Sequence, residues 1–134
     1  MLKIGTLTKW GQVDHITKTE TPGAYWISTP SHGALVMESV LLDGMSAGHE
    51  LRSFAVRSRC SVADNAGRIM LEEDCDYTLG VLAIAADADD RTLSPEVAIH
   101  ALAVIGRSDI NAALLTRYAT DAIARDATSA ALAR

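Results

Sequence analysis

The sequence predicts an α+β domain in which an N-terminal antiparallel sheet of three to four strands packs against about three C-terminal helices. Short segments rich in β-branched and aromatic residues, separated by Pro and Gly, occupy the first 40 residues. Longer aliphatic segments with helix start signals occupy the residues after 70. The chain has 134 residues, of which 49% are hydrophobic. This size and composition suit one domain, 1–134, with a single core.

Residues 1–40 are predicted to form a β-meander. The strands are expected at 13–18, 24–29 and 34–38, with a possible edge strand at 2–7. Pro22-Gly23 and Pro30 to Gly33 are typical turn sequences between such strands. We expect one face of this sheet to be covered by the helices.

The remaining chain reads as helical, with a weak pattern over 46–56 and clearer helices over 72–86, 95–106 and 109–131. Aspartates and glutamates before the aliphatic run 79–86 favour a helix start, because carboxylates interact well with the positive end of the helix dipole. This helix is expected to be central, packed on the sheet and on other helices. Ser94 before Pro95 is an expected N-cap, and Asp109 is the expected cap of the last helix.

Charge is distributed unevenly along the chain. Residues 1–60 hold six Lys or Arg against five Asp or Glu, whereas 61–134 hold six against twelve, and the net charge is −5. Without a basic cluster, direct nucleic-acid binding is not expected. No apolar run is long enough to span a membrane and no signal sequence is recognised, so we expect a cytoplasmic protein with Cys60 and Cys75 reduced.

The turn motif, 29–33, contains Ser31, His32 and Gly33, which are ingredients of nucleophilic sites. In working triads, however, nucleophile and base come from separate parts of the chain, whereas neighbours on a tight turn point apart. We therefore interpret the motif as a structural turn with a hydrogen-bonded histidine, and assign no catalytic residue.

The acidic motif, 72–76, contains Asp74 and Cys75 among further carboxylates. It could bind a divalent metal, or Cys75 could be an activated nucleophile at a helix start. On one helical turn these side chains would radiate outward, and the neighbouring carboxylates would raise the pKa of the thiol. Helix capping with a buried Cys is the preferred interpretation, and no metal or cofactor is expected. The histidines and cysteines also lack zinc-ligand spacing.

Seven carboxylates and no basic residue lie between positions 69 and 90. They are either a solvated helix end or a face that pairs with Lys and Arg of a partner. The partner-binding residues of this hypothesis are Glu72, Glu73, Asp76, Asp87, Asp89 and Asp90, and they are expected to lie exposed on one face.

Three features in order resemble a domain family without established activity that occurs in proteins of phages, plasmids and integrated elements. They are Trp10-Gly11, the sequence TPSHG at 29–33 and the sequence EEDCD followed by Tyr77. The similarity covers about residues 9–106. This family usually has a second Gly where this chain has Ala34, and Tyr and Trp beside the acidic motif where this chain has Leu71 and Tyr77. The resemblance implies an origin in mobile DNA.

Small acidic proteins of mobile elements often block host proteins, and this chain is similar in size and charge to anti-CRISPR inhibitors. The expected function is a non-enzymatic inhibitor of a host defence complex, which binds a host protein or ribonucleoprotein as a monomer or small homo-oligomer. Two alternatives remain open. One is a small hydrolase that depends on a metal or on Cys and His, which requires His32 and Cys75 to meet in one pocket. The other is a structural accessory domain.

Overall fold

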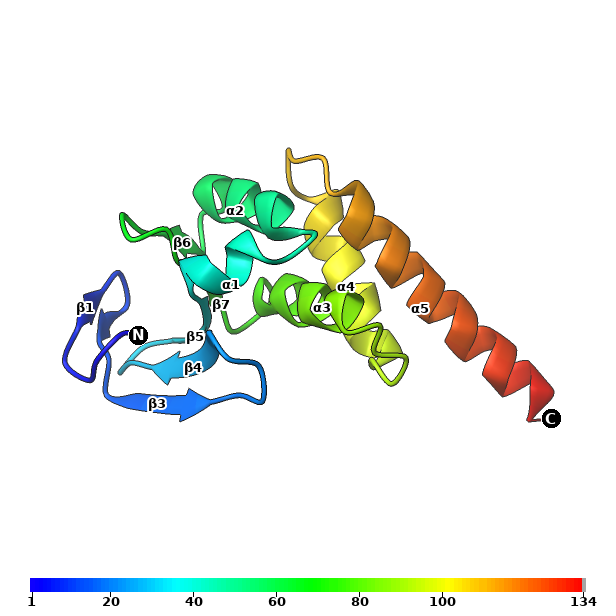
Figure 1. Cartoon of the computed structure of the whole chain (residues 1–134), viewed down its shortest axis with the longest axis horizontal. Coiled ribbons are helices and arrows are strands. Elements are labelled where there is room, and N and C mark those ends of the chain that lie inside the picture. The colour runs from blue at the N-terminus through cyan, green and yellow to red at the C-terminus, as the bar shows by residue number, and fades with distance from the viewer. Residues whose placement is uncertain (134) are drawn as a thin grey trace.

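The computed structural model describes residues 1–133 and has an α+β fold (Figure 1). Its main sheet is antiparallel and has five strands in the order β3-β4-β5-β7-β6. The strands are β3 (His15–Lys18), β4 (Ala24–Ser28), β5 (Gly33–Met37), β6 (Val62–Ala63) and β7 (Ile69–Glu72). A separate hairpin consists of β1 (Leu7–Thr8) and β2 (Gly11–Gln12).

The predicted meander is confirmed as β3, β4 and β5, but the remaining strands differ from the prediction. Residues 2–7 do not join the main sheet, because Leu7 pairs with Gln12 in the small hairpin. The added strands are β6 and β7, which come from the stretch between the predicted helices. The run Ile69-Met70-Leu71 is short and continuously apolar, as a strand buried on both faces should be.

Helices cover one face of the sheet, as predicted, and the N-terminal segment covers the other. On one face, Leu35 of β5 and Leu71 of β7 belong to the main core with α2 and α3. On the other face, Val36 and Met70 belong to a second core with the N-terminal segment, which contributes Leu2 and other residues. Alternate residues of each central strand therefore serve different cores. The N-terminal segment is a cover for the sheet instead of its edge.

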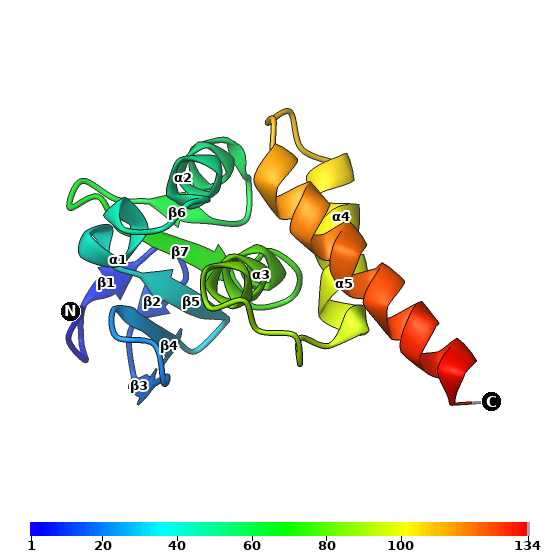
Figure 2. The same cartoon turned by 45° about the vertical axis from the view of Figure 1, so that its right-hand side comes forward.

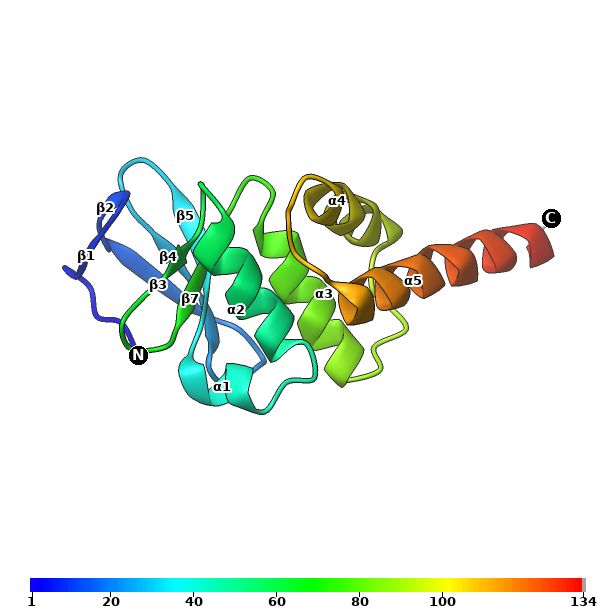
Figure 3. The same cartoon turned by 90° about the horizontal axis from the view of Figure 1, so that it is seen from above.

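Five helices complete the described residues 1–133: α1 (Ser39–Asp43), α2 (Gly48–Arg57), α3 (Tyr77–Asp87), α4 (Pro95–Gly106) and α5 (Ala113–Leu132). α3 is central, as predicted, and lies between the sheet and the pair α4 and α5 (Figure 2). The C-terminal half of α5 extends away from the rest of the fold (Figure 3). No helix of the described residues is long and apolar enough to cross a membrane.

The predicted helix 72–86 begins five residues later than expected. Glu72 ends β7, residues 73–76 form turns, and α3 starts at Tyr77. Pairing with β5 keeps the backbone of Glu72 extended, so tertiary hydrogen bonds override the local preference of carboxylates for a helix start. The acidic motif is thus a strand end followed by a turn.

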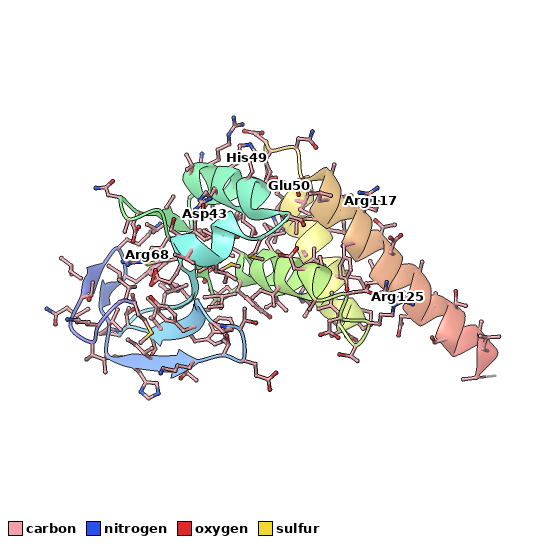
Figure 4. All side chains as sticks on the ribbon, viewed as in Figure 1. Asp43, His49, Glu50, Arg68, Arg117 and Arg125 are labelled. Atoms are coloured by element: carbon pink, nitrogen blue, oxygen red, sulfur yellow. The ribbon has the colours of Figure 1, made fainter. Side chains whose placement is uncertain are left out.

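Ser94 is the N-cap residue of α4, as predicted, but its expected capping hydrogen bond is missing, and the cap of α5 differs from the prediction. Ser94 precedes Pro95 as predicted, but its hydroxyl donates to Glu96 Oε2 at 2.6 Å and caps no backbone group. Asp109 does not cap α5, which begins at Ala113. The first turn of α5 is capped by Glu50 of α2 (Figure 4). The carboxylate oxygens of Glu50 accept hydrogen bonds from Leu114 N at 3.1 Å and from Leu115 N at 3.2 Å.

We expect Glu50→Ala to lower the free energy of unfolding by about 1–2 kcal/mol, because a charged cap of two backbone amides is lost. Thermal denaturation followed by circular dichroism measures this effect. Glu20→Ala is the matched control, since Glu20 is exposed and makes no side-chain hydrogen bond or ion pair among residues 1–133. Equal thermal midpoints for the two variants would contradict a capping role for Glu50.

Candidate metal-binding site

The turn motif and the acidic motif, 40 residues apart in the chain, meet where β5 pairs with β7. Ala34 lies opposite Glu72 in the antiparallel register, and Glu73 N donates to Gly33 O at 3.1 Å. A Cβ atom at Gly33 would come within 2.5 Å of Glu73 Oε2, so a larger residue there would require the side chain of Glu73 to move. Strand pairing therefore brings together two motifs that the sequence keeps apart.

The turn motif is a structural turn, as predicted, but the imidazole of His32 makes no hydrogen bond within residues 1–133, contrary to the expectation. Thr29 Oγ1 donates to His32 O at 2.7 Å, and Thr29 N donates to the same oxygen at 2.9 Å. Ser31 Oγ donates to Trp10 O at 2.8 Å, which anchors the β1-β2 hairpin. Ser31 is therefore occupied structurally, while His32 is held with its imidazole near β7.

His32, Glu72 and Asp74 form a cluster of potential metal ligands. Each offers one ligand atom, and the three atoms lie within 4.8 Å of one another. His32 Nδ1 is 3.8 Å from Glu72 Oε1, which is too long for a hydrogen bond. The imidazole side chain is 42% exposed and Asp74 is exposed, so the cluster opens to solvent on one side.

Glu72 is the buried member of the cluster, with 5% of its surface exposed. Burial raises the pKa of its carboxyl group, and the negative charge of Asp74 raises it further, against a lowering by the hydrogen bond from Asp74 N. No Lys or Arg forms an ion pair with Glu72 or Asp74 within residues 1–133. Within residues 1–133, His32 is the one basic side chain that lies within 4.0 Å of either carboxylate.

The structure corrects the helical placement of the acidic motif on which the sequence-based argument against a metal relied. That argument placed Glu72 and Asp74 on one turn of a helix, where their side chains would radiate outward. In the structure Glu72 belongs to a strand and Asp74 to the following turn. The chain can therefore fold Asp74 back so that its amide donates to Glu72 Oε1 at 2.8 Å.

Asp76 is buried rather than exposed, with 6% of its surface accessible. Its Oδ2 accepts hydrogen bonds from Ser58 Oγ at 2.7 Å and Ser61 Oγ at 2.6 Å. Ser61 Oγ in turn accepts from Glu72 N at 3.1 Å. Asp76 is thus a structural acceptor that ties the loop after α2 to the end of β7.

Cys75 does not belong to the ligand cluster and is half-buried. Burial raises the pKa of its thiol, and the charges of Asp76 and Glu72 add to this, while Arg107 lowers it only in part. This shift opposes formation of the thiolate, which is the nucleophilic form of a cysteine. This agrees with the interpretation of Cys75 as a packing residue.

The six carboxylates of the expected partner-binding face do not share one exposed face. Glu72 and Asp76 are buried, whereas Glu73, Asp87, Asp89 and Asp90 are exposed. Glu73 precedes α3, whereas Asp87 ends this helix and Asp89 and Asp90 follow it. The 11 residues of α3 span about 16 Å, so Glu73 and the three aspartates lie at opposite ends of the helix. Glu72 is buried because it continues a central strand, and Asp76 is buried because it accepts hydrogen bonds from two serine hydroxyls.

Sequence reasoning missed the residues that hold the site together. Thr29 orders the turn that bears His32, and Ser61 connects the end of β7 with Asp76. Thr29 lies within the turn motif, and its hydroxyl was a detectable signal for a side-chain-stabilised turn. Ser61 lies in a stretch of loop composition, where nothing in the local sequence distinguishes it.

Comparison of the chain with protein-family models, with curated proteins and with solved structures finds no significant match.

Proposed function

We propose that the protein binds a divalent transition-metal ion through His32, Glu72 and Asp74, and that it acts as a small metal-dependent hydrolase. The observation on which the proposal rests is the meeting of the turn motif and the acidic motif, which places one imidazole and two carboxylates within 4.8 Å. No Lys or Arg of residues 1–133 forms an ion pair with the buried Glu72 carboxylate. A bound cation balances this negative charge.

The donor set favours certain ions. One imidazole nitrogen with two carboxylate oxygens suits Zn²⁺ or Mn²⁺, whereas Ca²⁺ prefers six to eight oxygens. Two ligands of one such ion at about 2.2 Å lie at most about 4.4 Å apart. His32 Nδ1 and Glu72 Oε1 are 3.8 Å apart, which is within this limit, and the three donor atoms all lie within 4.8 Å of one another.

The site geometry resembles a catalytic rather than a structural metal centre. Structural zinc sites have four protein ligands, while catalytic sites have three and leave a position for water. His32 and Asp74 face solvent, so the remaining coordination positions are accessible to water and substrate. A metal ion lowers the pKa of its bound water and makes it a nucleophile near neutral pH.

The inhibitor of host defence remains a prediction. Its acidic face is reduced to Glu73 and the group Asp87, Asp89 and Asp90. Within that group, Asp87 Oδ1 accepts from Ser46 N and Asp90 Oδ1 from Thr92, and Asp89 lies 3.8 Å from Arg91. These local contacts are those of ordinary loop and helix ends, so the geometry favours the metal site.

Isothermal titration of the full chain with Zn²⁺ and Mn²⁺ tests the proposal. We expect one ion per chain and a loss of affinity of roughly tenfold or more in His32→Ala, because one of three protein ligands is removed. His49→Ala is the control, since His49 is an exposed histidine on α2 (Figure 4). Absence of binding to the unaltered protein, or equal affinity in both variants, would refute the metal site.

Hydrolase activity is tested separately with chromogenic carboxylate and phosphate esters. Turnover is expected with the ion present, and loss of turnover with a chelator or in His32→Ala. Metal binding without turnover of either ester class would leave the site structural and would contradict the hydrolase.

A further inference from the structure

A groove lies between the C-terminal ends of α2 and α4, and it has a volume of about 460 Å³. Three arginines line it, namely Arg57, Arg59 and Arg107. They come from two segments about 50 residues apart in the sequence, so only the fold brings them together. In a chain with a net charge of −5, this convergence of guanidinium groups is a distinct positive feature.

The three groove arginines form no ion pair within residues 1–133, although Asp76 and Asp109 also belong to the lining of the groove. Arg52, Arg68 and Arg91 each form an ion pair, but no carboxylate of residues 1–133 lies within 4.0 Å of the nitrogens of the three groove arginines. Asp76 lines the groove with its Oδ2 bonded to two serine hydroxyls. Arg57 Nη1 donates at 3.3 Å to the backbone carbonyl of Asp109, not to its carboxylate.

Other groups of the groove suit an organic anion. Phe54 and Val104 are the apolar members of the lining, and both are largely buried. The hydroxyls of Ser58 and Ser108, which also line the groove, donate to Asp76 Oδ2 and to Ile105 O. Lys9 lies close by, because its Nζ donates to Arg59 O at 2.7 Å. The volume falls within the range of small-molecule sites, and guanidinium groups bind phosphate through paired N–H donors.

We infer that this groove binds a small molecule that carries a phosphate group, with Arg59 and Arg107 as its principal anion contacts. Arg57 is partly engaged by Asp109, whereas Arg59 and Arg107 donate no side-chain hydrogen bond within residues 1–133 and are exposed. The inference is independent of the proposed metal site, since none of the three metal ligands lines the groove.

Titration with inorganic phosphate, followed by two-dimensional amide NMR in a buffer that contains a chelator, tests the inference. The chelator removes metal-dependent binding, so failure of the metal proposal does not affect the result. We expect saturable shifts in the unaltered protein and an affinity at least about tenfold lower in Arg59→Gln/Arg107→Gln, because two charge-assisted contacts are lost.

Arg91→Gln/Arg117→Gln is the control, since it removes the same charge from arginines outside the groove. It should bind phosphate within about twofold of the unaltered protein, which separates a local site from general charge attraction. If the double groove variant is unfolded by circular dichroism, Arg107→Gln alone replaces it. Absence of saturable binding, or equal loss in groove and control variants, overturns the inference.

Discussion

Replacement of Gly48 by Ala is expected to destabilise the protein by roughly 3 kcal/mol. Helix propensity alone predicts the opposite sign, because Gly48 opens α2 and Ala favours a helix over Gly by up to about 1 kcal/mol. A Cβ atom at Gly48, however, would overlap the carbonyl oxygen of Leu42 in the preceding turn. That oxygen belongs to the backbone, so the connection between α1 and α2 must shift to relieve the contact.

Gly106→Ala is the matched control for this effect. Gly106 is also helical, at the end of α4, but a Cβ atom there would meet nothing within 4 Å. This variant should be stabilised by up to about 1 kcal/mol. Urea unfolding of both variants measures whether each substitution lowers or raises the free energy of unfolding. A Gly48→Ala protein as stable as the parent would show that α2 does not approach Leu42 as closely as described.

Glu72→Gln is expected to remove metal binding and to stabilise the metal-free protein at neutral pH. The pKa of the Glu72 carboxyl group is raised by burial and by Asp74, so its ionised form costs folding free energy. Gln has nearly the same shape and cannot ionise. A saturating divalent ion at 100 times its dissociation constant stabilises the parent by about 2.7 kcal/mol, and the variant should lose that gain.

The pH dependence follows from the direction of the same shift. A carboxyl group whose pKa is higher in the folded state contributes stability that is fully present below its unfolded pKa and is lost as the pH rises through its folded pKa. The stability advantage of Glu72→Gln over the metal-free parent should therefore be small in acid and larger at neutral pH. Thermal denaturation of the parent and of Glu72→Gln, in acid and at neutral pH, measures the stability advantage of the variant. The same measurements with Mn²⁺ give the stabilisation by the metal.

Glu73→Gln is the control, because Glu73 is the exposed neighbour and is not one of the three cluster ligands. It should retain the stabilisation by Mn²⁺ and show no comparable gain at neutral pH. A Glu72→Gln protein that Mn²⁺ still stabilises by the full amount would exclude Glu72 as a ligand.

Much of the secondary structure was predictable because its signals are local. The helix over 95–106 matches α4 to the residue, since Pro95 supplies a start signal that depends on no tertiary contact. β4 and β5 were predicted close to their observed bounds because Pro and Gly separate them. β7 was missed, since a short apolar run such as Ile69-Met70-Leu71 fits a buried strand and a buried helix equally well, and pairing with β5 and β6 decides between them.

The candidate site was predictable in its residues but not in its arrangement. The turn motif and the acidic motif were both recognised, yet the carboxylates were assigned to solvent because a helix was expected there. Because Glu72 belongs to a strand, its side chain points to one face of the sheet, and that face is buried at this position. No local pattern indicated that Ser61 would accept a hydrogen bond from Glu72 N and donate one to Asp76.

The amino-acid sequence by itself determined the α+β class, the meander, the central position of the aliphatic helix and the acidity of the second half. These depend on side-chain periodicity, turn chemistry and charge, which are properties of neighbouring residues. Only the tertiary structure decided which carboxylates are buried, that Glu50 caps α5, and that His32 faces Glu72 and Asp74. Such contacts join residues far apart in the chain, and their geometry is set by strand register and helix packing rather than by local preference.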